Sequence, residues 1–66
     1  MDEDFYTVEE VAKKLRLKVY TIREYIREKK LIAYRFGREY RIKKEDFDKF
    51  VEERRTDHPQ TFGDKN

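Results

Sequence analysis

Apolar residues in the first half of the chain repeat with the period of a helix, and the repeat is interrupted once. They recur at i, i+3, i+4 and i+7 over residues 8–15, which predicts an amphipathic helix there. The rhythm breaks at Leu17 and restarts, which predicts a second helix over about residues 19–29. Two short helices joined by a tight turn at residues 16–18 are typical of a helix-turn-helix unit.

The residues at the start of the first helix are typical of a helix end, whereas the residues in the turn between the two helices are not. Residues 1–6 are expected to be an acidic lead, after which Thr7 and Glu10 form a Thr-x-x-Glu capping box at the first helix. Arg16 stands where a helix usually ends on a left-handed glycine. Lys18 is a weak N-cap compared with Ser, Thr or Asp. We therefore expect a turn that is mildly strained or that departs from the usual geometry.

Strict alternation of apolar and polar residues replaces the helical period over residues 31–43. The alternation runs on both sides of Gly37, which predicts a β-hairpin. Two registers fit the pattern. A two-residue turn pairs Phe36 with Glu39, whereas a three-residue loop pairs Phe36 with Tyr40.

The three-residue loop is the favoured register because of the apolar face that it creates. It also pairs Tyr34 with Ile42, so that four apolar side chains share one face of the hairpin. Arg35 and Arg41 then lie together on the opposite face, with Arg38 at the tip.

A third helix is predicted over about residues 45–54, with Phe47 and Phe50 on its apolar face. Residues 56–66 are polar and contain a proline and a glycine, so we expect a disordered tail there and one domain over residues 1–55. The predicted fold class is α+β, a small winged helix-turn-helix with two helices, a β-hairpin wing and a C-terminal helix. The expected core consists of Val8, Val11, Ala12, Leu15, Leu17, Ile22, Ile26, Leu31, Tyr34, Phe36, Tyr40, Ile42, Phe47, Phe50 and Val51.

The net charge of +2 hides a strong asymmetry along the chain. Residues 16–44 contain eleven Lys or Arg and three Glu, a net charge of +8, whereas residues 1–15 and 45–66 each have a net charge of −3. A positive middle region is typical of a surface that binds a polyanion. The alternative is an ordinary Lys/Glu-rich surface of a small or heat-tolerant protein, but such surfaces usually interleave their signs.

Catalytic and metal chemistry have few residues to use. The chain contains no cysteine and no serine, and its single histidine, His58, falls in the predicted tail. A zinc or other transition-metal site would therefore have almost no ligands, and a nucleophile–base pair has no serine or cysteine to build on. We expect no enzymatic activity, no cofactor and no metal.

The chain offers no membrane or export signal. No apolar run approaches the roughly 20 residues that span a bilayer, and the first four residues, Met-Asp-Glu-Asp, are acidic where a signal peptide is basic. We expect a soluble cytoplasmic protein of prokaryotic, viral or mobile-element origin, with no membrane partner.

The outward positions of the second predicted helix form a candidate DNA-reading edge. Arg23 is suited to guanine, Glu24 to the amino group of cytosine, and Val19 to the methyl group of thymine. Val19 is also placed to pack under the turn, and Glu24 to pair with Arg27. Phosphate contacts are assigned to Lys18, Tyr20, Thr21 and Arg27 on this helix. The wing adds the candidate DNA-binding residues Arg35, Arg38 and Arg41.

Two strings, YTVEEVAKKLRL and VYTIREYIREKKLIAYRFGREYRIKKEDFDKF, resemble the excisionase-type winged helix-turn-helix domains that are related to the MerR regulators. The resemblance covers about residues 6–52 and includes the small Ala12 where the helices cross. Arg16 and Lys18 depart from the Gly and Ser that are usual in the turn. The resemblance implies a second helix in the major groove and a wing, with Arg38 and Arg41, on the adjacent minor groove or its phosphates.

The function expected from these features is sequence-specific binding of double-stranded DNA. By resemblance, the main hypothesis is an excisionase-like architectural factor that binds repeated sites by cooperative self-association and bends DNA for an integrase or recombinase. A small MerR-like transcriptional regulator would use the same module. A protein-interaction module without DNA binding, using the acidic lead and the third helix as its surface, is the alternative from another class.

Overall fold

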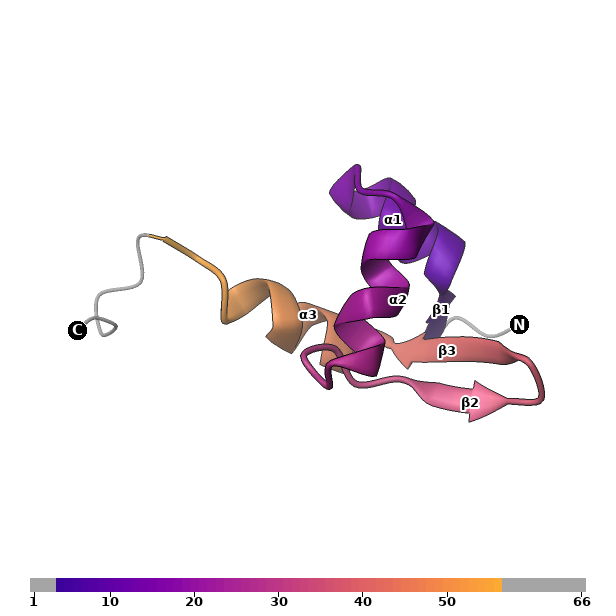
Figure 1. Ribbon diagram of the computed structural model, residues 1–66. Helices are drawn as coiled ribbons and strands as arrows, with labels where there is room; N and C mark the ends of the chain where they lie inside the picture. Colours follow the sequence, from indigo (N-terminus) through magenta and orange to yellow (C-terminus); the bar gives the residue numbers. More distant parts are fainter. Residues whose placement is uncertain (1–3, 57–66) are drawn as a thin grey trace.

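The computed structural model describes residues 4–56, which form three helices and a three-stranded antiparallel sheet (Figure 1). The order of elements is β1 (Phe5–Thr7), α1 (Val8–Leu15), α2 (Val19–Arg27), β2 (Tyr34–Phe36), β3 (Glu39–Lys43) and α3 (Lys44–Glu52). Helices α1 and α2 lie on one side of the sheet, and the β2–β3 hairpin projects beyond them as a wing (Figure 1). The predicted winged helix-turn-helix is confirmed. The predicted tail lies outside the described residues except for Thr56, which is exposed.

The predicted start of α1 is confirmed in detail. The Thr7 hydroxyl accepts a hydrogen bond from the Glu10 backbone N–H at 3.0 Å, and the Glu10 carboxylate accepts one from the Thr7 N–H at 2.9 Å. This capping box provides partners for two backbone donors that have none within the helix. Val8, Val11 and Ala12 form the buried face of the helix.

The turn between α1 and α2 is closed by a basic residue in the left-handed conformation. Arg16 has φ 57° and ψ 43°. Its N–H donates to the Lys13 carbonyl at 3.2 Å, and the Leu17 N–H donates to the Ala12 carbonyl at 2.9 Å. This pair of bonds is the Schellman motif, which normally uses glycine at the left-handed position. The unusual turn therefore has the usual hydrogen bonds, formed around an unfavourable residue.

Helix α2 ends in the same way, which corrects its predicted length. Lys29 has φ 63°, its N–H donates to the Ile26 carbonyl at 3.0 Å, and the Lys30 N–H donates to the Tyr25 carbonyl at 2.9 Å. The helix stops at Arg27, two residues before the predicted end, because a left-handed residue cannot continue it. At its other end, Lys18 makes no side-chain capping bond.

The sheet contains a strand that the sequence pattern did not predict. Phe5, Tyr6 and Thr7 pair with β3 in an antiparallel register that places Tyr6 opposite Ile42. Residues 1–6 are expected from the sequence to be an acidic lead without a strand, so the strand at Phe5–Thr7 corrects that description. Three residues are too short to show a recognisable alternation, and the strand exists because β3 offers a free edge.

The hairpin adopts the two-residue turn instead of the favoured three-residue loop. Phe36 lies opposite Glu39, and Tyr34 lies opposite Arg41. Gly37 has φ 66° as the first residue of the turn, the position that a type II′ hairpin turn gives to glycine. The prediction of a three-residue loop was wrong, and a one-residue change in register moves side chains to the other face of the sheet.

The core is smaller than predicted and lies between the helices and one face of the sheet. The sheet contributes Ile42, with Tyr6 and Tyr40 partly buried beside it. The buried apolar side chains are Val8, Val11, Ala12, Ile22, Leu31, Ile42, Phe47 and Phe50. Four residues predicted in the core are exposed instead: Leu17, Tyr34, Phe36 and Val51. The register accounts for Tyr34 and Phe36, whereas Leu17 and Val51 lie at the rim of a surface groove between the α1–α2 turn and α3.

Candidate nucleic-acid interface

Helix α2 presents a polar stripe on the side opposite its buried face. Tyr20, Arg23 and Arg27 are exposed, with 67% of Tyr20 accessible to solvent, whereas Ile22 is fully buried. Residues spaced by three, four and seven positions share one side of a helix. Tyr20, Arg23 and Arg27 therefore form a continuous exposed stripe along α2.

The carboxylate on this stripe is engaged within the helix. Glu24 Oε2 accepts a hydrogen bond from Arg27 Nη2 at 2.6 Å, which is the pairing that the sequence left open. Val19 is partly buried and packs against the core, as the second interpretation of that residue allowed. Thr21 is also half-buried, whereas Lys18 is exposed at the start of the helix.

The wing arginines are distributed differently from the prediction. Arg35 lies opposite Tyr40 on the face of the sheet nearer the helices, where its guanidinium carbon is 5.7 Å from the Tyr40 ring centroid. Its Nε donates to the Gly37 carbonyl at 3.1 Å. Arg41 belongs to the opposite face, since it pairs with Tyr34, and Arg38 is exposed in the turn. The structure therefore separates Arg35 from Arg41 instead of bringing them together.

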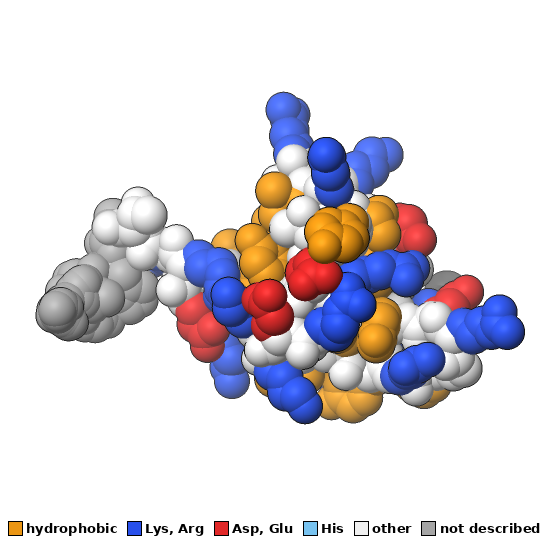
Figure 2. Space-filling view, in the orientation of Figure 1, with side chains coloured by type: hydrophobic (Ala, Val, Ile, Leu, Met, Phe, Trp, Pro, Cys, Tyr) orange, Lys and Arg blue, Asp and Glu red, His pale blue; other side chains and the backbone are white. Residues whose placement is uncertain are grey.

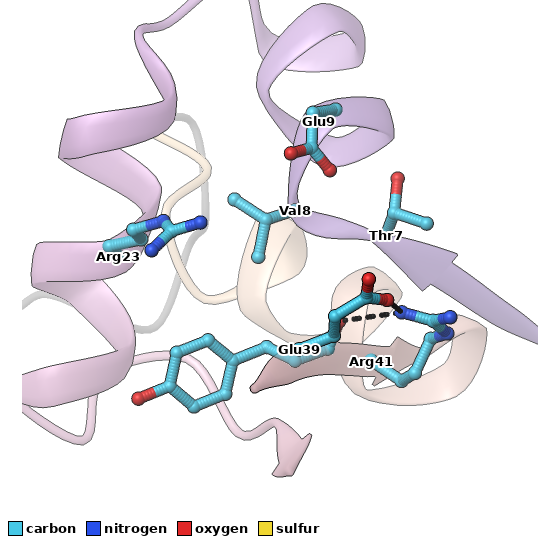
Figure 3. A pocket seen from close by; sticks show the side chains of 7 residues that line it. Thr7, Val8, Glu9, Arg23, Glu39 and Arg41 are labelled. Atoms are coloured by element: carbon cyan, nitrogen blue, oxygen red, sulfur yellow. Dashed lines mark hydrogen bonds and ion pairs between the residues drawn. The ribbon is translucent and has the colours of Figure 1, made fainter. Parts of the chain in front are cut away.

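A hollow of about 270 Å³ connects α2 with the wing. Arg23 reaches into it from α2, and Tyr40 and Arg41 line it from β3 (Figure 3). Strand β1 ends at Thr7, opposite Arg41, so the edge of β3 is open to the hollow from that point toward the turn. The residues at the beginning of α1 complete the wall. Helix α2 and the wing therefore share one concave surface, which has an arginine on each side and is also lined by the carboxylates of Glu9 and Glu39.

Glu39 is a residue of this hollow that was absent from the predicted site. Its Oε1 accepts a hydrogen bond from Arg41 Nη1 at 2.8 Å, and the same Nη1 lies 3.4 Å from the Tyr40 carbonyl oxygen (Figure 3). The available signal was the i, i+2 spacing of Glu39 and Arg41 within one strand, which places two side chains on the same face. Once the correct register is known, this ion pair is expected.

Lys and Arg side chains are spread over the face of the molecule that Figure 2 shows. Figure 2 shows Lys and Arg side chains around the α1–α2 end, across α2 and along the hairpin, with acidic side chains beside some of them. Such a surface attracts phosphate groups, and a protruding helix with an adjacent hairpin matches the shape of a duplex groove and its backbone. The chemistry available here is hydrogen bonding to bases and charge pairing with phosphates.

Other kinds of site are not seen in the part of the chain that the structure describes. Within residues 4–56, no three His, Cys, Asp or Glu side chains are grouped so that they could hold a metal ion. No helix in that range is long and apolar enough to cross a membrane. His58 lies outside the described residues.

Comparison with known proteins places this fold in a family. Comparisons with curated proteins and with solved structures found no significant match. A comparison with protein families matched residues 5–55 to a family described as a helix-turn-helix domain, and this range contains all six described elements. The family includes excisionase-like domains, and membership supports sequence-specific DNA binding in general. The chain belongs to this helix-turn-helix domain family.

Proposed function

We propose that the protein is an excisionase-like architectural factor that binds double-stranded DNA in site-specific recombination. The observation that carries the DNA-binding part of this proposal is the hollow in which Arg23 of α2 and Arg41 of β3 face a common space. A duplex that receives α2 in its major groove would bring a phosphate backbone against the wing. Helix and wing would then act as one surface.

Base reading is assigned to α2. Arg23 is exposed and suited to a bidentate hydrogen bond with guanine. Glu24 would accept from cytosine only after releasing Arg27, so a cytosine contact and a phosphate contact by Arg27 would form together. Val19 is half-buried, and its contact with a thymine methyl would use only the accessible part of the side chain.

Phosphate contacts are assigned to the residues around the reading stripe, because they position the protein without selecting a sequence. On the wing, Arg38 is exposed at the tip and Arg41 is half-buried at the hollow. Arg35 stacks over Tyr40, which restricts its guanidinium before any ligand arrives. The remaining assigned residues are Lys18, Tyr20, Thr21 and Arg27.

The architectural part of the proposal rests on the family and on size. A single small DNA-binding module typically buries about 600–1,000 Å² of protein surface, which limits the affinity of one copy. Cooperative self-association on repeated sites, or contact with an integrase, would raise occupancy by effective concentration. We propose both as partners of a cytoplasmic protein from a prokaryote, virus or mobile element, without enzymatic activity of its own.

Footprinting on the DNA that flanks the protein's own gene tests this proposal. Repeated protected sites beside an attachment site, with bending in a circular-permutation gel assay, are expected for the architectural factor. A single unbent site at a promoter would indicate a small MerR-like regulator instead. Absence of any protected site, together with capture of a protein partner, would support the protein-interaction module.

A further inference from the structure

The face of the sheet that points away from the helices carries an exposed aromatic cluster. Phe5 contacts Tyr34 and Phe36 with ring centroids 6.1 and 6.3 Å apart and with nearly perpendicular planes. Tyr34 and Phe36 remain 41% and 57% exposed. Several other large apolar side chains of the described residues are also exposed, but these three rings touch one another and form one contiguous patch. A contiguous exposed apolar patch marks a surface that is available for binding.

Basic side chains lie beside these rings. Lys43 is opposite Phe5 in the sheet register, and its Nζ lies 5.2 Å from the centroid of the Tyr34 ring. Arg41 is opposite Tyr34 on the same face. Glu39 also belongs to this face, but its carboxylate is bound by Arg41. Among the described strand residues, this face therefore combines accessible rings with the basic side chain of Lys43.

We propose that this aromatic face of the sheet, formed by Phe5, Tyr34, Phe36 and Lys43, binds single-stranded nucleic acid. Bases stack on exposed aromatic rings whatever their sequence, and a basic groove or rim attracts the linking phosphates. Tyr34 and Phe36 are two positions apart on one strand, so their side chains leave the same face in succession. Lys43 lies where it can exchange its contact with the Tyr34 ring for a phosphate.

The charge of the face selects this occupant over a second copy of the chain. Arg41 on this face is already paired with Glu39, so two copies docked face to face would bring the Lys43 ammonium groups of both molecules into one interface. Like charges at close range oppose association. A nucleic-acid strand complements both features of the face, because its planar bases can stack on the rings and its phosphates can pair with Lys43. Stacked bases also match the chemistry of an aromatic surface better than an acidic peptide does.

The aromatic face adjoins the duplex-reading surface, and the two share Glu39 and Arg41 at their boundary. Along β3, Tyr40 and Ile42 point toward the core and the helices, whereas Lys43 points to the other side of the sheet. Arg41 lies where the two surfaces meet, so the three rings and Lys43 alone define the single-strand face. The proposal therefore goes beyond duplex recognition. One molecule would be able to hold a duplex on α2 and an unpaired strand on the sheet.

Fluorescence anisotropy with two labelled probes tests the proposal, one an oligothymidine of about 12 nucleotides and the other a duplex. The double variant Tyr34→Leu with Phe36→Leu removes both exposed rings and retains apolar side chains. It is expected to lose single-strand affinity by about tenfold or more, because each stacked base is worth about 1–3 kcal/mol. Duplex affinity is expected to stay within about twofold.

The matched control is Tyr20→Leu, which removes an exposed ring from α2. It is expected to weaken duplex binding and to leave oligothymidine binding unchanged. Tyr34→Phe retains the ring and is expected to retain single-strand binding. Lys43→Gln covers the case in which the double leucine variant does not fold, and it should reduce the salt slope of single-strand binding by about 0.7.

Four results would overturn the proposal. The wild-type protein could fail to bind oligothymidine while it binds the duplex. The double variant could bind oligothymidine as well as the wild type does, or it could lose both probes equally while its circular dichroism spectrum shows that it is folded. Sedimentation velocity could also reveal a self-associated species that only the double variant dissolves, which would assign the face to a second copy. The oligothymidine probe tests the single-strand proposal, and the duplex probe tests the proposed function. Failure of the first proposal can therefore be distinguished from failure of the second.

Discussion

Arg41 Nη1 donates a hydrogen bond to Glu39 Oε1 at 2.8 Å, and this ion pair lies in the hollow shared by α2 and the wing. The side chains of Arg41 and Glu39 are 34% and 66% exposed, so the pair contributes little to stability. Its main consequence is expected for binding, since in the proposed complex the Glu39 carboxylate would compete with a DNA phosphate for the same guanidinium. We therefore expect Glu39 to limit non-specific attraction of the duplex.

Replacement of Glu39 by glutamine is expected to tighten duplex binding. Glu39→Gln releases Arg41 and removes a negative charge from the hollow, which should raise affinity about two- to fivefold at low salt, the range expected for an exposed ion pair. Fluorescence anisotropy on one duplex measures the change. The control is Glu53→Gln, which removes the same charge at the end of α3. Equal affinities of the two variants would show that Glu39 has no local effect.

Substitutions of Arg23 and Arg38 are expected to have different effects on DNA binding, one on base preference and the other on overall affinity. Arg23→Ala should relax base preference at one position of the site, at a cost of about 1–3 kcal/mol on the preferred sequence. Arg38→Ala should weaken binding to all sequences about equally and reduce the salt slope by about 1, because a wing-tip arginine neutralises a phosphate. Binding-site selection with each variant distinguishes the two effects. Uniform losses from both variants would mean that α2 does not read bases.

The left-handed Arg16 is expected to limit the stability of the domain. A non-glycine residue in this conformation costs about 1 kcal/mol, so Arg16→Gly should raise the melting temperature by several degrees for a domain of this size. Thermal unfolding followed by circular dichroism measures the shift. Lys13→Gly, within α1, is the matched control and should lower the melting temperature instead. A decrease with Arg16→Gly would show that the Arg16 side chain makes a stabilising contact worth more than the backbone strain.

The parts of the fold that could be predicted are those encoded by neighbours in the sequence. The capping box of Thr7 and Glu10 and the start of α2 depend on local spacing, and the structure confirms both. Strand β1 could not be predicted, because it depends on pairing with β3, more than thirty residues later in the chain. The hairpin register failed for a related reason. The prediction assumed one apolar face, whereas Phe5 covers part of a second one.

The candidate interface could be predicted only in part, because the wing residues depend on the register of the hairpin. The exposed stripe of α2 follows from helical periodicity, so the positions of Arg23 and Arg27 could be inferred from the sequence. The partners of the wing arginines could not, because they depend on a register that differs by one residue from the expected one. The correct register separates Arg35 from Arg41 and brings Glu39 to Arg41.

The salt dependence of duplex binding tests most directly whether α2 and the wing form one DNA-binding surface. If the surface neutralises roughly six phosphates, the logarithm of affinity should fall with the logarithm of salt concentration at a slope of about −5. The measurement is an anisotropy titration of the full chain on a duplex at several salt concentrations. A slope near that value is the predicted result, and the absence of salt-dependent binding to any duplex would contradict it.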